Sequence, residues 1–346
     1  MQALGFVGGA RIPADTAATW RQQPAEATLA AVVTGLPPIY STFGFELHLG
    51  TPRPAIDLGI GVERAAAPAL QEWCSRRAVG PPRHAPAWRA LARFGAEWAR
   101  RESPLAAVPF VFLEFDCASA PADTAPSLFV ALDHAEGDRS AALHIAHRTL
   151  AGALRRGRRA RAHAARERAA AALRSDARVL HLGLMLSRAR RPVRLSVGLP
   201  ARHLAAALRR LGLPAAAATA LRGLVACGTS AEPAAIVQVD FDTTSIPATA
   251  LGFTLQPPRP DDWAAWLAWL EHRGLCDAAQ RAMLLDWRGA HDERVGPLAA
   301  PVSVQRYLSH IKLVWRSGAV LAKAYIGATP SPTLLRHPPP LATPFG

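Results

Sequence analysis

Five stretches of the chain each hold two short runs of alternating apolar and polar residues, separated by a turn or a loop. Alternation with a period of two predicts strands, and two such runs joined by a turn predict a β-hairpin. The expected strand pairs are residues 43–49 with 56–62, 108–116 with 127–132, 180–188 with 193–199, 236–242 with 250–255, and 307–315 with 320–327.

Segments in which large apolar side chains recur at helical spacing lie between the hairpins. They are expected at residues 15–33, 86–101, 140–154, 204–211 and 263–270, the last after a pair of aspartates, 261–262, that caps the helix. Hairpins that close into a ring lose their exposed edges, and the helices then cover the outer face. The sequence predicts an α+β fold, a ten-stranded antiparallel β-barrel of five hairpins surrounded by a ring of α-helices. Two separate open sheets are the alternative.

We expect a single domain over residues 1–328 and a proline-rich tail over 329–346. No stretch has the form of a signal peptide, and no apolar run reaches the roughly 18–20 residues of a membrane helix. The four cysteines are scattered without a CxxC pair, so neither a disulfide framework nor a zinc site is suggested. The expectation is a cytoplasmic protein with no membrane partner, no metal and no cofactor.

Each hairpin has one apolar face and one mixed face. Because the helices need an apolar sheet face to pack on, the mixed faces should point into the barrel. A barrel of about ten strands is wide enough to hold a ligand. The expected lumen residues are Glu46, Glu114, Met185, Arg194, Asp240, His310, Lys312, Lys323 and Tyr325. If the sheet were open instead, these faces would look out to water.

The formal net charge of +14 raises nucleic acid as a partner. Of the 40 basic residues, however, only Lys312 and Lys323 are lysines, and the chain is rich in Ala, Arg, Gly and Pro, as a GC-rich genome produces. The arginine-rich run at 155–161 lacks interleaved aromatic residues and is interpreted as a solvated surface. Nucleic acid is therefore not the favoured partner, and the two lysines are the more informative residues.

The turn at Ser317 and Gly318 fits a two-residue hairpin loop and places Lys312 directly opposite Lys323. The same register places His310 opposite Tyr325. Like charges directly opposite one another are destabilising, and a polyanion such as diphosphate between them would relieve the repulsion. In the competing interpretation, the hairpin is exposed and its two lysines are simply solvated.

Glu114 is an acid among aromatic residues, in the run Phe-Leu-Glu-Phe-Asp. It could take a proton from a nucleophilic acceptor, or it could make a structural hydrogen bond. His48 and Asp57 are expected to be cross-strand neighbours, but no nucleophile accompanies them. The chain contains no GxGxxG, P-loop, HExxH or GxSxG motif.

The pattern of five hairpins with intervening helices resembles the ABBA-type aromatic prenyltransferases, whose barrel encloses a ligand chamber. The resemblance implies transfer of an allylic group with little or no dependence on metal, in a bacterial enzyme of secondary metabolism. Lumen cations and tyrosines would hold the diphosphate and shield the carbocation, and the residues that match by role are Lys312, Lys323, Arg194 and Tyr325. Since the chain has only three tyrosines, Phe112, Phe129 and Met185 are expected to replace part of that shield.

The leading functional hypothesis is a prenyltransferase that joins an allylic diphosphate to an aromatic small molecule or a peptide side chain. In this hypothesis Glu114, or as second choice Glu46, acts as the catalytic base. Asp240, His310 and Met185 complete the substrate-binding set. The alternatives are a non-catalytic barrel that binds an anionic ligand or a peptide, and a basic nucleic-acid-binding protein.

Overall fold

The computed structural model describes residues 24–51, 55–80, 84–117, 121–132, 139–151, 178–188, 193–228, 236–242, 250–255, 262–293, 302–316 and 318–332. The first part of the predicted opening helix (15–23), the arginine-rich run at 155–161, Asp261 and the chain from 333 onward lie outside the described residues. All nine residues that the sequence nominated for the site lie within them.

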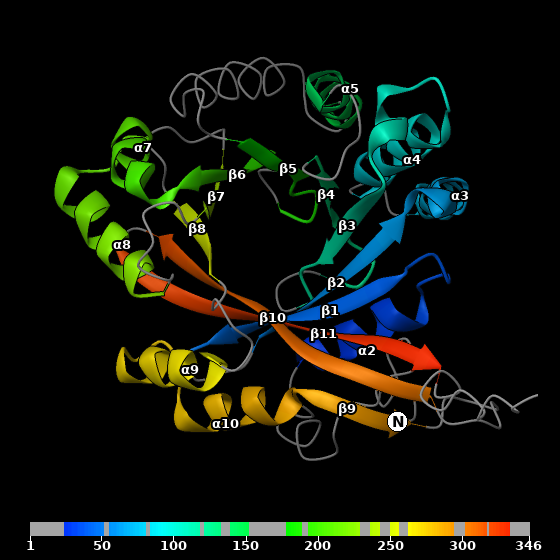
Figure 1. Ribbon diagram of the computed structural model, residues 1–346. Coiled ribbons are helices and arrows are strands. Elements are labelled where there is room, and N and C mark those ends of the chain that lie inside the picture. Colours follow the sequence, from blue (N-terminus) through cyan, green and yellow to red (C-terminus); the bar gives the residue numbers. More distant parts are fainter. Residues whose placement is uncertain are drawn as a thin grey trace, which may run out of the picture.

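Eleven described strands form one antiparallel sheet. They are β1 (Thr42–Leu49), β2 (Ile56–Glu63), β3 (Phe110–Phe115), β4 (Ser127–Ala131), β5 (Arg178–Leu184), β6 (Val193–Pro200), β7 (Ile236–Asp242), β8 (Ala250–Leu255), β9 (Gly289–Glu293), β10 (Val302–Arg316) and β11 (Ala319–Pro332). Neighbours follow in the order β11-β1-β2-β3-β4-β5-β6-β7-β8-β10, and β10 pairs back with β11. Ten strands therefore close into the predicted barrel, and Figure 1 shows the ring.

Helices surround this ring on its outside (Figure 1). Those that the structure describes are α2 (Pro24–Thr34), α3 (Ala67–Arg77), α4 (Ala85–Ala99), α5 (Arg139–Ala151), α7 (Leu204–Arg210), α8 (Ala215–Gly228), α9 (Trp263–His272) and α10 (Ala278–Trp287). The expected helices at 86–101, 140–154, 204–211 and 263–270 are confirmed, whereas α3, α8 and α10 were not predicted individually. None of the described helices is long and apolar enough to cross a membrane.

The core lies between the outer face of the barrel and the helices. On α4, Trp88, Leu91, Phe94 and Trp98 recur at intervals of three or four residues and are at most 2% exposed. The indole N–H of Trp98 donates to the carbonyl of Val108 at 2.8 Å, so this large side chain is buried without an unsatisfied donor. The strands supply every second residue to the same core, among them Phe45, Leu58, Leu113, Leu182, Leu195, Val239, Phe253, Ile311 and Ala324. The apolar faces point outward, as predicted, and the mixed faces line the lumen.

The last hairpin is longer than predicted. β10 and β11 extend to Val302 and Pro332, so β11 enters the segment that the sequence assigned to the tail. β9 pairs with the start of β10, and its sequence, Gly-Ala-His-Asp-Glu, lacks the alternation that would have indicated a strand. A bulge at Ser309 shifts the register of the hairpin. It leaves the predicted pairs of Lys312 with Lys323 and His310 with Tyr325 in place.

Candidate active site in the barrel lumen

Polar side chains from most of the strands meet on the inner face of the barrel. β1 supplies Glu46 and His48, β2 supplies Asp57, β3 supplies Glu114, β6 supplies Arg194, β7 supplies Asp240, β10 supplies His310 and Lys312, and β11 supplies Lys323 and Tyr325. The cross-strand registers place Glu46 beside both Asp57 and Tyr325, and His48 beside Lys323. The predicted site residues are therefore brought together by closure of the ring, which joins the first strand to the last.

Lys312 forms an ion pair with Asp240, although a whole strand, β8, lies between β10 and β7. The lysine side chain can cross β8 because residue 252 is a glycine. A Cβ at Gly252 would lie 2.6 Å from Lys312 Cε and 3.4 Å from Asp240 Cβ. Burial alone would raise the pKa of Asp240, but the charges of Lys312 and Arg194 lower it to about 2. Asp240 is thus a carboxylate throughout the neutral range.

Lys323 forms a second ion pair, with Glu46 on the neighbouring strand. The hydroxyl of Tyr325 donates to the other oxygen of the same carboxylate. Burial would raise the pKa of Glu46, but the charge of Lys323 and these hydrogen bonds hold it well below its usual range. Burial and the charge of Glu46 in turn raise the pKa of Tyr325 well above its usual value, so Tyr325 keeps its proton.

The lysine pair thus has the predicted geometry but a different source of compensation. Lys312 and Lys323 lie directly opposite each other on the inner face. Their mutual repulsion does not require a bound polyanion, because Asp240 and Glu46 neutralise one lysine each. The sequence argument missed these partners, because Glu46 is brought beside Lys323 only by ring closure and Asp240 lies two strands away from Lys312, across β8.

His48 joins Glu46 to Asp57, with its Nε2 atom 3.4 Å from Glu46 Oε1 and 3.2 Å from Asp57 Oδ2. The three side chains have the composition of a metal site, with ligand atoms all within 4.8 Å of one another. Burial would lower the pKa of His48, but hydrogen bonds to the two carboxylates raise it to about 9. At neutral pH the ring is protonated and is itself the cation between the carboxylates, so the group is an ion-pair network.

Glu114 lies at the centre of the inner face of β3, opposite Gly59 on one side and Ser127 on the other. Burial and the charges of Glu46 and Asp116 raise the pKa of Glu114 to about 7, against the opposing charges of Arg194 and Lys323. Within the described part of the chain no hydrogen bond or ion pair holds its carboxyl group. Glu114 is therefore a carboxyl group able to exchange a proton near neutral pH.

Arg194 is the lumen cation that has no ion-pair partner among the described residues. Burial opposes its charge, but Asp240, Glu114 and Glu46 favour it and raise the pKa of the guanidinium further. Lys312 and Lys323, by contrast, are each engaged by a carboxylate. Arg194 is thus the cation most readily available to an anionic ligand.

His310 is uncharged, because burial and the nearby charge of Lys312 lower its pKa to about 3. Its ring stacks on Tyr325, with centroids 4.1 Å apart and planes at 15°, and its Nδ1 atom lies 3.0 Å from the hydroxyl oxygen of Ser309. We expected His310 and Tyr325 both to donate to phosphate oxygens. The hydroxyl of Tyr325 instead donates its hydrogen bond to Glu46, which leaves Nε2 of a neutral His310 for a ligand.

Aromatic side chains cover the inner wall across β3, β4 and β5. Phe112 lies edge-on to His181, with ring centroids 6.1 Å apart. The ring of Phe129 lies over Gly183, where a Cβ would come within 2.6 Å of it. Met185 follows β5 and is fully buried, and its place on the mixed face stays a prediction. This wall is the apolar part of the lumen.

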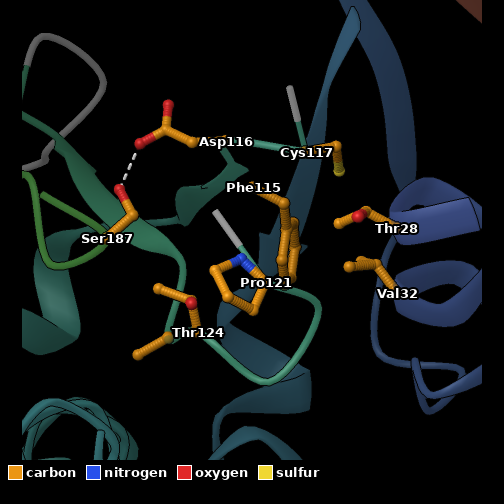
Figure 2. A pocket seen from close by; sticks show the side chains of 9 residues that line it. Thr28, Val32, Phe115, Asp116, Cys117, Pro121, Thr124 and Ser187 are labelled. Carbon is orange, nitrogen blue, oxygen red and sulfur yellow. Dashed lines mark hydrogen bonds between the residues drawn. The ribbon is translucent and has the colours of Figure 1, made fainter. Parts of the chain in front are cut away.

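Sequence reasoning missed a chain of polar groups at the end of β3. The Ser187 hydroxyl donates to Asp116 and lies 3.0 Å from the Ser127 hydroxyl. Asp116 and Ser187 also line a small pocket of about 10 Å³, shown in Figure 2, together with Thr28, Val32, Phe115, Cys117, Pro121, Thr124 and Ala125. The available signal was that Glu114, Asp116 and Ser187 all fall on mixed faces.

No known protein-family profile matches the sequence, and no curated protein sequence matches it. Solved structures do match. The 5-dimethylallyltryptophan synthase from Streptomyces coelicolor is 17% identical, with a TM-score of 0.55 over 90% of this chain and 93% of that one. The prenyltransferase PriB, in a ternary complex with L-tryptophan and dimethylallyl thiolodiphosphate, is 16% identical, with a TM-score of 0.54 over the same shares. The chain has the barrel fold of these prenyltransferases, which confirms the predicted resemblance at the level of the fold.

Proposed function

We propose that the protein transfers an allylic group from a diphosphate donor to an aromatic small molecule or a peptide side chain inside the barrel. One arrangement carries the proposal. A carboxyl group that titrates near neutral pH, Glu114, and a guanidinium without an ion-pair partner in the described part of the chain, Arg194, interact across a lumen that has an aromatic wall. The shared fold with a dimethylallyltryptophan synthase adds support.

Arg194 is the first contact expected for the diphosphate. Lys312 and Lys323 would follow, because phosphate oxygens compete with Asp240 and Glu46 for the two ammonium groups. Charge-assisted hydrogen bonds of this kind are worth about 1.5–3 kcal/mol each. As the C–O bond of the donor breaks, its electron pair stays on the diphosphate, and the cations stabilise the charge that develops there.

The allylic cation would lie against the aromatic wall, where Phe112 and Phe129 exclude water and present π faces to the positive charge. An electron-rich carbon or heteroatom of the acceptor then bonds to the allylic carbon. The acceptor must lose one proton to restore its neutral form, and the raised pKa of Glu114, about 7, supports this carboxyl group as the base that receives it.

A non-catalytic barrel that binds an anionic ligand is the second candidate. It is favoured by the pairing of Lys312 and Lys323 with carboxylates, because this leaves Arg194 to bind an anion but fewer cations to stabilise a departing diphosphate. Binding of an anion without product formation would distinguish it from an enzyme.

The decisive experiment combines turnover with binding. The purified protein is incubated with dimethylallyl, geranyl or farnesyl diphosphate and with tryptophan, tyrosine or a tryptophan-containing peptide, and products are sought by mass spectrometry. Calorimetry with dimethylallyl thiolodiphosphate, a dimethylallyl diphosphate analogue, measures donor binding separately. We expect a prenylated product and saturable donor binding. Donor binding without any product would support the second candidate, and the absence of both would refute both.

Two substitutions separate the roles. Arg194→Gln should weaken binding of the analogue by about tenfold or more. Glu114→Gln should leave that binding intact while slowing turnover by about 10²–10⁴-fold. Arg281→Gln, which removes an arginine paired with Glu271 outside the lumen, is the control and should change neither. Equal binding by the Arg194 variant and the control would contradict the assigned role.

A further inference from the structure

Three polar side chains form a hydrogen-bonded chain at the end of β3 that the proposed reaction does not yet use. Ser127 is fully buried and Asp116 is 8% exposed. The hydroxyl of Ser187 lies between them, 3.0 Å from Ser127 Oγ and hydrogen-bonded to Asp116 Oδ2. Buried polar groups are costly unless satisfied, and a chain of three calls for a physical reason.

The direction of this chain is fixed by its chemistry. An ionised carboxylate only accepts hydrogen bonds, so Ser187 donates its single proton to Asp116. The contact between the two serines must then use the proton of Ser127. The single O–H of Ser127 is then used in the hydrogen bond to Ser187, so its oxygen can only accept a hydrogen bond from a further group on its other side. The chain is therefore polarised toward Asp116.

Glu114 is the titratable group on that other side. It pairs directly with Ser127 across β3 and β4, where the Cβ atoms of facing residues are about 4.5–5.5 Å apart. One side-chain rotation, or one bridging water, would join the Glu114 carboxyl group to Ser127 Oγ. When protonated, Glu114 is the donor that the free lone pairs of Ser127 require.

The far end of the chain opens into the pocket between β3 and α2 (Figure 2). Its volume of about 10 Å³ suffices for about one water molecule. Thr124, which is 8% exposed and lines the pocket, has a hydroxyl oxygen without a hydrogen-bond partner among the described residues. Asp116 lines the same pocket, and a water molecule there would give the Thr124 hydroxyl a hydrogen-bond partner. Arg188, whose Nε is 3.7 Å from Asp116 Oδ2, is partly exposed and leads from the chain to solvent.

We infer that Ser127, Ser187 and Asp116 form a proton-exit path from Glu114 to the pocket beneath α2. This inference rests on the proposed function for its purpose, since it provides a route for the proton that the acceptor loses. The charged groups that face Glu114 are Glu46 from β1, Asp116 after β3, Arg194 from β6 and Lys323 from β11. Among these groups, only Asp116 is linked through hydroxyl groups to Ser127, the residue that faces Glu114, in the described structure.

The proton balance is closed at every step. The acceptor gives its proton to the Glu114 carboxylate. Glu114 then gives a proton to Ser127 while Ser127 passes its own to Ser187 and Ser187 passes its own to Asp116. Asp116 releases one proton to water in the pocket, and rotation of the two hydroxyl groups restores the chain. The serines are positioning and relay residues, because neither touches the reacting atoms.

The first test needs no substrate. In infrared spectra of the resting protein, the carbonyl band of protonated Glu114 is identified by its loss in Glu114→Gln. We expect Ser127→Ala to move this band to higher frequency, because the carboxyl group loses its hydrogen-bond acceptor. Ser103→Ala is the matched control, since Ser103 is also buried but caps a short 3-10 helix far from the lumen. An unmoved band in Ser127→Ala would overturn the path, whether or not the protein is a prenyltransferase.

The second test uses turnover of whichever donor and acceptor pair reacts. Ser187→Ala should lower kcat by about tenfold or more, leave KM unchanged and increase the solvent deuterium isotope effect, while Ser187→Thr keeps the hydroxyl and restores wild-type kinetics. A merely structural role would lower the melting temperature without moving the isotope effect. Wild-type kinetics in a folded Ser187→Ala variant would refute the relay. If no pair reacts at all, it is the proposed function that fails, and the infrared test still decides the path.

Discussion

The two faces of the same barrel wall solve opposite problems. On the outer face, side chains such as Phe45 and Leu58 are at most 2% exposed and pack against helices, with few polar groups to satisfy. On the inner face, carboxylates and cations are withdrawn from water and must compensate one another. Because strand residues alternate between the faces, each strand carries both kinds of residue. The contrast teaches that stability resides mainly in the outer layer, and chemical reactivity in the inner one.

The outer face should be the easier one to break. Trp98→Ala removes a large, fully buried side chain and its hydrogen bond to Val108, and should lower the free energy of unfolding by about 3–5 kcal/mol. Chemical denaturation followed by circular dichroism measures the change. If a single substitution in the lumen lowered the free energy of unfolding more than Trp98→Ala does, stability would not reside mainly in the outer layer.

On the inner face, the largest loss of stability should come from leaving a buried charge without its ion-pair partner. Lys312→Met leaves Asp240 without its partner and should cost about 2–4 kcal/mol, because Arg194 still faces the carboxylate. The folded pKa of Asp240, about 2, lies below the usual 3.8, so its contribution is present above pH 3.8 and lost as pH falls toward 2. This loss of stability at low pH should be smaller in the variant, in which Arg194 and Ser196 still lower the pKa of Asp240. The double variant Lys312→Met/Asp240→Leu should recover most of the loss, and failure to recover would show that the lysine acts through packing alone.

A substitution at Glu114, unlike the one at Lys312, should increase the stability of the protein. Its pKa is raised from 4.5 to about 7, so the contribution of its carboxyl group to stability falls as pH rises through that window. Glu114→Gln should therefore stabilise the protein by about 1–3 kcal/mol near pH 8 and have no effect near pH 4. Thermal unfolding across this range measures both values. A destabilised variant at the higher pH would mean that the carboxylate is held by favourable contacts.

The smallest effect is expected at the surface. Arg76 pairs with Glu72 one turn away on α3, and both side chains are more than half exposed. Arg76→Ala should change the free energy of unfolding by about 0.5 kcal/mol or less. Denaturation of this variant beside the lumen variants checks whether the arginine excess is energetically neutral. A loss comparable with that of Lys312→Met would contradict this view.

Local patterns in the sequence were sufficient for the hairpins, for the face that each strand turns inward and for the register of the last hairpin. Period-two alternation fixes the faces, and a two-residue turn fixes which residues oppose one another, so the pair of Lys312 and Lys323 could be predicted. β9 could not, because its polar sequence carries no alternation and it is held only by pairing with β10.

The sequence was sufficient to predict which residues belong to the candidate site, but not which ion pairs and hydrogen bonds they form. The polar residues nominated from the strands lie on the predicted face, but their partners could not be predicted. Lys312 reaches Asp240 because residue 252, on the strand β8 between them, is a glycine. Lys323 meets Glu46 because ring closure pairs the first strand with the last. Ser187 was missed as a relay because the sequence predicted strand up to 188, whereas β5 ends at Leu184 and Ser187 lies in the turn that follows.

Closure by the last strand also bears on how the chain is made. One of the two strands that pair with β1 is β11, in which residues 322–328 face residues 43–49, almost at the other end of the chain. During synthesis, the edge of β1 that pairs with β11 therefore stays unpaired until the last strand has left the ribosome. Contacts so distant in sequence slow folding, and an open edge invites pairing with other chains. Nascent or truncated forms that lack β11 should consequently depend on chaperones far more than the finished protein does.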